Sequence, residues 1–197
     1  MRYEPEHKEE TRRRVLKAAA KTMRAEGPHR MGVAKVMAQA GLTHGGFYAH
    51  FRSKDELVSA TIDQMFDEAR RKLDRQTEGR APGEAIAAYV DFYLSPAHRD
   101  ARVSGCPMPF LAADLPRLAK AARVRFAAGV ERLRMRLADL LADLGAPNPE
   151  AEACSMVAEL VGALSLARSE PDRTKSDILL ARSRAALKRR IGLEEPA

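Results

Sequence analysis

Residues 40–54, AGLTHGGFYAHFRSK, combine side chains that can reach phosphate groups with a pair of glycines. Gly41 can end one helix in the left-handed conformation that a Cβ would resist, and Thr43 can accept hydrogen bonds from the free amides of the next helix. Gly45 and Gly46 each cost about 1 kcal/mol relative to Ala inside a helix, so close approach to a phosphate or base edge explains them better than stability does. The segment predicts a helix-turn-helix with a DNA-reading second helix.

The elements on either side must hold this segment in place. Residues 6–26 and 33–40 have helical apolar spacing, and Phe47 and Phe51, one turn apart, are expected to anchor the reading helix in the core. Ser53 is followed three residues later by Glu56, a capping box that predicts the start of a long helix. That helix would connect the DNA-binding part to the rest of the chain and transmit a change between them.

The remaining chain also has helical spacing and lacks the period-2 alternation of strands, so the predicted fold class is all-α with about nine helices. Residues 77–83 form the clearest linker. We expect Pro96 to end the helix after this linker, Pro107 to open a short helix, and Pro116 to open a longer one that reaches residue 144. Two further helices are expected to begin near residues 149 and 172, the second ending near residue 192.

Residues 33–57 resemble the DNA-binding domain of the TetR (tetracycline-repressor-like) family of bacterial regulators. The family's third helix has the pattern Gly-hydrophobic-Ser/Thr-x-Gly-x-hydrophobic-Tyr-x-His/Tyr-Phe-x-Ser/Thr-Lys, and residues 41–54 match it. Residues 105–115, GCPMPFLAADL, are similar to the start of the sixth helix in many members. The resemblance implies an N-terminal three-helix DNA-binding domain at residues 1–54 and a C-terminal helical ligand-binding and dimerisation domain at residues 55–197.

The same resemblance, taken residue by residue, implies six DNA-binding residues. They are Thr43, His44, Gly45, Tyr48, His50 and Lys54. Tyr48, His50 and Lys54 are expected to hold phosphates, while His44 and the Gly45 backbone are expected to face base edges. Gly32 departs from the pattern, because many members have a Ser or Thr there that touches a phosphate.

Aromatic and sulfur-containing residues of the second part are expected to converge on a pocket for a small apolar or aromatic inducer, although ordinary core packing explains them equally well. They are Tyr89, Phe92, Tyr93, Cys106, Met108, Phe110, Phe126 and Met156. Cys106 precedes Pro107 at an expected helix N-terminus, where the helix dipole would lower the thiol pKa and make it reactive. A buried, inert thiol is the alternative that we favour, and Cys154 is expected to pack in the interior.

Residues 153–167 are apolar on nearly every side of their helix, so this helix needs two partners. We expect the second partner to be the same helix of another subunit, giving a homodimer joined as a four-helix bundle. The expected interface residues are Val157, Leu160, Val161 and Leu164.

Charge is concentrated at the N-terminal end. The 197 residues have a formal net charge of +7, and residues 1–55 contain 12 Lys and Arg against 6 Asp and Glu. A basic end of this kind suits phosphate binding. The sequence shows no secretory signal, no membrane-spanning segment, and no metal-ligand or catalytic spacing, so we expect a cytoplasmic protein without cofactor or enzymatic activity.

Three functions remain open from the sequence. The first is a repressor that a small molecule releases from palindromic operator DNA. The second is a basic nucleoid-type protein that coats DNA without sequence preference, which the glycine pair and the near-neutral body disfavour. The third is a variant of the first, a repressor that senses oxidants or electrophiles through Cys106.

Overall fold

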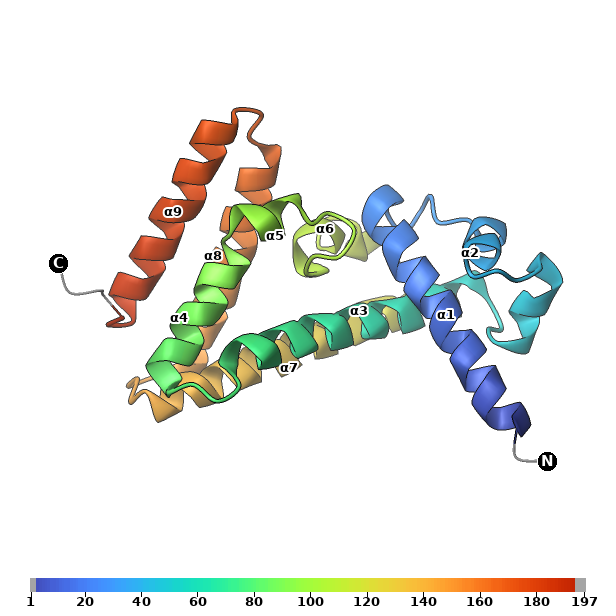
Figure 1. Ribbon diagram of the computed structural model, residues 1–197, viewed down its shortest axis with the longest axis horizontal. Coiled ribbons are helices and arrows are strands. Elements are labelled where there is room, and N and C mark those ends of the chain that lie inside the picture. Colours follow the sequence, from blue (N-terminus) through green and yellow to red (C-terminus); the bar gives the residue numbers. More distant parts are fainter. Residues whose placement is uncertain (1–2, 194–197) are drawn as a thin grey trace.

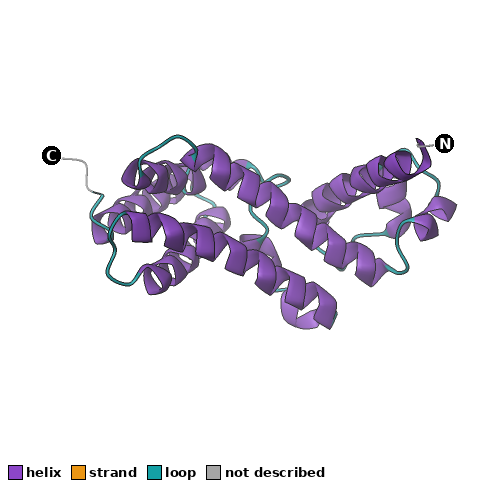
Figure 2. Ribbon diagram, turned by 90° about the horizontal axis from the view of Figure 1, so that it is seen from below, coloured by secondary structure: helices purple, strands orange, loops and turns teal. Residues whose placement is uncertain are grey.

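The structure, a computed structural model, describes residues 3–193 of the chain, and within that range it contains helices and loops but no strand (Figures 1 and 2). The elements in chain order are α1 (Tyr3–Glu26), α2 (Val33–Gln39), the 3₁₀ helix η1 (His44–Ala49), α3 (Lys54–Thr77), α4 (Pro82–Tyr93), α5 (Pro96–Asp100), α6 (Met108–Leu111), the 3₁₀ helix η2 (Leu115–Arg117), α7 (Lys120–Asp143), α8 (Pro149–Ser169) and α9 (Arg173–Arg190). The all-α prediction is confirmed. No described helix is long and apolar enough to cross a bilayer.

Helix α3 joins the two ends of the molecule. It has 24 residues, which corresponds to about 36 Å of helix, and it packs against α1 at its N-terminal end, against α7 along its length and against α4 towards its C-terminal end (Figure 1). The expected cap is present, because the Ser53 hydroxyl accepts a hydrogen bond from the Glu56 amide at 3.1 Å. The Glu56 carboxylate accepts a bond from the Arg52 amide at 2.7 Å instead of the Ser53 amide of a standard capping box.

Two helix boundaries differ from the expectations. Pro96 ends no helix but opens α5, because the Ser95 hydroxyl accepts a hydrogen bond from the His98 amide at 3.1 Å and Pro is favoured in the first turn. Pro116 lies in η2, and α7 begins only at Lys120. In both places the proline marks a helix start, but sequence spacing alone does not tell which helix.

The packing of α3 on α7 depends on one glycine. The Phe66 ring of α3 lies edge-on to Phe126 of α7, with ring centroids 5.3 Å apart. A Cβ at Gly129 would lie 2.3 Å from the Phe66 ring, so only glycine permits this approach. Buried apolar residues form one cluster that extends from α1 to α9, and α3 contributes to it from Leu57 to Leu73.

Candidate functional site

The turn between α2 and η1 has the predicted left-handed glycine. Gly41 has φ +71°, and the Leu42 amide reaches back to the Met37 carbonyl at 2.9 Å. The Arg14 guanidinium of α1 donates to the Ala40 carbonyl at 2.8 Å, which satisfies a free carbonyl at the end of α2. These bonds fix the angle at which η1 leaves α2.

One face of η1 is locked in the core and the other is exposed. Phe47 and Phe51 are buried and stack with ring centroids 5.7 Å apart, as predicted. Thr43, His44 and Tyr48 lie on the outside, where Tyr48 is 70% exposed. Rigid anchoring of one face therefore presents the other to solvent in a fixed orientation.

The two glycines of η1 have no intramolecular requirement that we can identify. Neither has a positive φ, and a Cβ at Gly45 would meet nothing within 4 Å. A Cβ at Gly46 would make ordinary contacts with Met37 at 3.7 Å and Thr43 at 3.9 Å. The segment forms a 3₁₀ helix, whose poorer hydrogen bonds are typical of short helical segments.

The Thr43 side chain does not cap η1, so that expectation is wrong. Thr43 occupies the cap position with φ −77° and ψ 152°, but its hydroxyl makes no cap hydrogen bond. Its backbone carbonyl instead accepts from the Gly46 amide at 3.1 Å. The hydroxyl is consequently available to a partner outside the chain.

His50 and Lys54 are less freely exposed than Tyr48. The His50 ring is half-buried, and its Nδ1 has no hydrogen-bond partner among the described residues. Burial lowers the pKa of His50, and the neighbouring charges of Lys8 and Arg12 lower it further. Lys54 Nζ donates to the His29 carbonyl at 3.2 Å, so its ammonium lies at the surface between α1, α2 and α3.

Sequence reasoning missed Arg12 as a positioning residue. Its guanidinium donates to the His50 carbonyl, lies 4.2 Å from the centre of the Phe51 ring, and is 3.9 Å from the Glu56 carboxylate. Arg12 thereby joins α1 to the end of η1. Nothing in the run RRR at residues 12–14 separates this arginine from a solvated one.

Comparisons with known proteins agree with this geometry. The family model for bacterial regulatory proteins of the tetR family matches residues 15–61. The HTH-type regulator YfiR of Bacillus subtilis is 30% identical over 105 residues, which are 53% of this chain and 51% of YfiR. A TetR transcriptional regulator from Chloroflexus aurantiacus has a similar structure, with a TM-score of 0.81, 25% identity and coverage of 96% of this chain and 98% of that one. Residues 15–61 therefore resemble the DNA-binding part of TetR-family regulators in sequence, and the chain has the fold of such a regulator along nearly its whole length.

The TetR-type fold extends over the body as well. The reduced form of NemR from Escherichia coli has a TM-score of 0.81 at 21% identity and covers 91% of this chain and 96% of its own, a likeness of fold alone. Sequence similarity is narrower, because this chain spans about half the length of YfiR. The DNA-binding part, residues 15–61, is therefore the part of the chain that matches the tetR family by sequence.

In the body, the predicted pocket residues fall into separate groups. Phe92 and Tyr93 of α4 contact His98, which stacks on Phe92 at 5.1 Å and meets Tyr93 edge-on at 4.8 Å, while Tyr89 lies against Phe92 and Tyr93. Phe126 pairs with Phe66 of α3 instead. The remaining predicted residues are Met108 and Met156, which are buried, and Phe110, which is half-buried. Burial fits both interpretations that the sequence left open, a pocket and ordinary core.

Cys106 is buried next to Tyr93. Burial raises the pKa of its thiol, and that effect outweighs the neighbouring Tyr93 hydroxyl and the arginines. The dipole of α6 was expected to lower the thiol pKa, but a helix of only four residues has a weak dipole. The Tyr93 hydroxyl is also buried and has no hydrogen-bond partner of standard geometry among the described residues.

A chain of hydrogen bonds links this region to α1. His98 Nε2 accepts from the Cys106 amide at 3.2 Å, so Nδ1 carries the proton and donates to the Tyr93 carbonyl at 2.8 Å. Burial lowers the pKa of this neutral imidazole to about 4. The neighbouring Gly105 carbonyl accepts from Arg24 Nε at 3.1 Å, and Arg24 also pairs with Glu68 of α3 at 2.7 Å.

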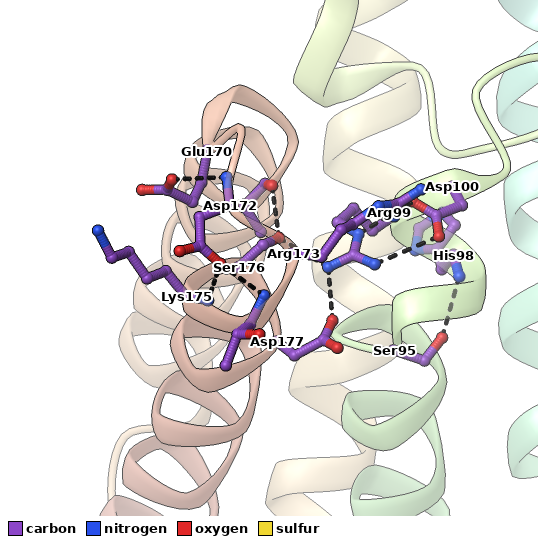
Figure 3. Close-up of polar contacts among 12 residues, drawn as sticks. Ser95, His98, Arg99, Asp100, Glu170, Asp172, Arg173, Lys175, Ser176 and Asp177 are labelled. Atoms are coloured by element: carbon purple, nitrogen blue, oxygen red, sulfur yellow. Dashed lines mark hydrogen bonds and ion pairs between the residues drawn. The ribbon is translucent and has the colours of Figure 1, made fainter.

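Buried Arg99 ties α5 to α9 (Figure 3). Its guanidinium donates to the Ser176 hydroxyl at 2.7 Å and to the Asp177 carboxylate at 2.6 Å. Hydrogen bonds from Arg99 and from Arg173 lower the pKa of Asp100 to about 2. This network fixes the loop before Gly105 against the last helix.

The interface residues predicted from α8 need correction. Leu160 and Leu164 are 1% and 0% exposed and Val157 is 9% exposed, because the chain's own core already covers them. Val161 is half-buried. The outward face of α8 has other residues, among them Leu166 at 61% exposure and Cys154, so the expectation that Cys154 packs inside is also wrong.

Proposed function

We propose that this protein is a dimeric repressor that binds a palindromic operator and leaves it when a small apolar or aromatic molecule binds among helices α3 to α8. One observation carries the proposal, namely that the exposed face of η1 has residues that the protein's own fold does not use. The side chains of Thr43 and His44 make no hydrogen bond or ion pair with described residues. A rigid surface without internal contacts suits the major groove.

Each exposed residue has a separate expected role. His44 and the Gly45 backbone lie at the start of η1, where a reading helix contacts base edges. Tyr48 lies within η1, His50 directly follows it and Lys54 opens α3, and all three can bind phosphates. Since His50 has a lowered pKa, it would act as a neutral hydrogen-bond donor, and its contribution should not change between pH 7 and pH 8.

Dimerisation is proposed through the outward faces of α8 and α9. Leu166 of α8 and Ile178 of α9, which is 44% exposed, lie among small exposed residues that permit close approach. These small residues are Ser155, Ala158, Ala181 and Ala185. Pairing of α8 and α9 with the same helices of a second copy would give a four-helix bundle and two η1 helices. Half-sites would then lie about 34–36 Å apart, or a small multiple of that distance.

The buried Tyr93 hydroxyl supports an inducer site near α4. It has no hydrogen-bond partner of standard geometry among the described residues and only the Cys106 thiol, a weak partner, beside it, so a polar group on an aromatic ligand would give it a stronger hydrogen bond. Tyr89 and Phe92 supply an aromatic environment. A ligand here would also displace His98, whose hydrogen bonds lead through Cys106 and Gly105 towards Arg24 of α1.

The thiol-sensing variant is the weaker form of the proposal. A buried thiol with a raised pKa stays protonated near neutral pH, and the thiolate is the reactive form. If Cys106 nevertheless senses oxidants, Cys106→Ser should abolish release by hydrogen peroxide and leave operator binding intact. Release that continues in Cys106→Ser contradicts the variant.

Selection of bound sequences from a random DNA pool tests the central proposal. We expect one palindrome, bound about 10³-fold or more above bulk DNA at physiological salt. Binding without sequence preference would instead support a DNA-coating protein. Lys54→Ala should weaken all sequences about equally and reduce the salt slope by about 1, whereas His44→Ala should relax preference at particular base pairs.

A matched control removes a charge far from η1. Arg80 follows the end of α3, at the opposite end of that helix from Lys54, and Arg80→Ala should leave operator affinity unchanged. Tyr93→Phe completes the set, because it should fold and bind operator normally while its response to phenolic or other polar aromatic ligands changes. Loss of operator binding in Arg80→Ala equal to that in Lys54→Ala would contradict the assignment.

A further inference from the structure

A basic groove lies at the junction of the DNA-binding part and the body. Its volume is about 410 Å³, and it is formed by α1, α3 and the loop between α5 and α6. The residues that line it are Lys17, Lys21, Arg24, Glu68, Arg71, Lys72, Arg75, Val103 and Ser104. The lining residues of α1 are three or four positions apart, and in α3 both Arg71 and Lys72 are three or four positions from Glu68 and from Arg75, so each helix turns one charged face towards the same space.

The charges of this groove are not balanced by the protein. Six of its lining residues are cationic, and Glu68 is the one lining carboxylate. Glu68 pairs with Arg24, whose side chain is 4% exposed. No ion pair with a described carboxylate is formed by the other five cations, which are Lys17, Lys21, Arg71, Lys72 and Arg75. Mutual repulsion among them favours an added anion.

Lys72 gives a second, independent indication of an anion site. Its side chain is half-buried, and its ammonium donates to the Ser104 carbonyl without any carboxylate partner. Burial lowers the pKa of Lys72, and the charge of Arg24 lowers it further. Glu68 attracts this ammonium without forming an ion pair with it, so a bound anion would add the charge-assisted hydrogen bond that the Ser104 carbonyl does not supply.

We propose that this groove binds a small molecule that carries two linked phosphate groups. Arginine and lysine side chains converge from two helices, which suits an anion with several acceptor oxygens. The volume lies in the range of small-molecule sites. The C-terminal half of α1 faces α6, whereas η1 lies on the far side of α2, so the groove is separate from the surface proposed for DNA (Figure 1).

The groove shares no lining residue with the inducer site proposed near Tyr93, although Arg24 connects the two through the Gly105 carbonyl. A diphosphate in the groove would contact α1, α3 and the loop that holds Ser104 at once. Binding should therefore raise the unfolding temperature, because a ligand that binds only the folded state stabilises it. A bound diphosphate would also hold α1 against the body, and this effect on the position of α1 would add to the effect of an inducer.

Calorimetric titration of the full chain with inorganic pyrophosphate, without DNA and at fixed ionic strength, tests the proposal. We expect saturable binding of one pyrophosphate per chain. The double variant Lys72→Gln, Arg71→Gln should weaken it about tenfold or more by removing two charge-assisted contacts. The control is Arg70→Gln, which removes a charge from the same turn of α3. Arg70 pairs with Asp74 at 3.1 Å and does not line the groove, so affinity should stay within about twofold.

Three results would overturn the proposal. The first is failure of pyrophosphate to saturate the wild-type chain, and the second is a loss of affinity in Arg70→Gln as large as that in the double variant. The third is weaker operator binding by Lys72→Gln alone in the absence of pyrophosphate, which would assign the groove to DNA. Unfolding temperatures of all variants show whether each is folded. Because the titration contains no DNA, failure of the operator assay leaves its outcome unaffected.

Discussion

The DNA-binding part and the body of this protein place their candidate residues in opposite environments. Around η1 the candidates are at the surface, and buried Phe47 and Phe51 hold the shape beneath them. In the body the candidates around Tyr93 are themselves the core, since Tyr93 is 1% exposed. Function and stability are consequently separable around η1 and inseparable around α4.

Basic residues show the same contrast. In the DNA-binding part, Arg12 and Arg14 donate to backbone carbonyls and position η1 from behind. In the body, buried Arg99 pairs with carboxylates and joins helices that are far apart in sequence. Substitutions should therefore alter DNA binding in the first part with little loss of stability, and they should alter stability first in the second.

The largest effect is expected within α8, where two leucines have opposite environments. Leu160→Arg would bury an unpaired charge in the chain's own core and cost about 3–5 kcal/mol, so the protein should unfold or aggregate. Leu166→Arg changes a residue that is 61% exposed, and it should leave the fold intact and yield monomers. Circular dichroism and sedimentation equilibrium separate the two outcomes.

The wild-type chain and Leu166→Ala serve as references in that experiment. If Leu166→Arg remains dimeric at micromolar concentration, the outward face of α8 is not the interface. A folded, monomeric Leu160→Arg would contradict the burial of this residue.

This contrast explains how much of the molecule the sequence could predict. The η1 surface was predictable because its residues are contiguous, so that local spacing assigns Phe47 to the core and Tyr48 to the outside. Helix α8 is apolar on nearly every side, and its spacing does not say which leucines face α7 and which face outwards. The prediction of its existence succeeded, and the choice of Leu160 for the interface failed for that reason.

Protonation of His98 should produce the next largest effect. Its folded pKa of about 4 lies below its ordinary value of 6.5, so the unfolded chain takes up the proton first as the pH falls. Stability is full above pH 6.5 and declines towards pH 4, with a loss of about 2 kcal/mol at pH 5 from this residue. Urea unfolding at pH 7 and pH 5 measures the change.

His98→Gln supplies the control for the other titrating groups. It removes the imidazole, so its stability should fall by about 2 kcal/mol less than that of the wild type between the two pH values. Equal declines would mean that His98 is protonated in the folded protein at pH 5 and that its bond from the Cys106 amide is absent.

Gly129→Ala should cost about 1–3 kcal/mol, because its Cβ would lie 2.3 Å from the Phe66 ring and separate α3 from α7. Thermal unfolding measures the loss. Phe66→Leu in the same chain should recover part of it, so the two substitutions should be less than additive. Additive losses would show that Phe66 does not meet the new methyl group. No sequence pattern gave this contact, because it joins helices more than 60 residues apart.

The smallest change in stability, and the sharpest test of the comparison, is Gly45→Ala. Gly45 has no positive φ and space for a Cβ, so alanine should stabilise the fold by about 0.4–1 kcal/mol through reduced freedom of the unfolded chain. Operator affinity should nevertheless fall, because the methyl group would lie between the backbone and a phosphate or base edge. Thermal unfolding and a gel shift on the selected operator measure the two effects.

The control is Gly46→Ala, whose methyl group faces Met37 and should leave operator affinity closer to that of the wild type. If Gly45→Ala binds operator as the wild type does, no close approach occurs at η1, and the glycine has no role in reading DNA.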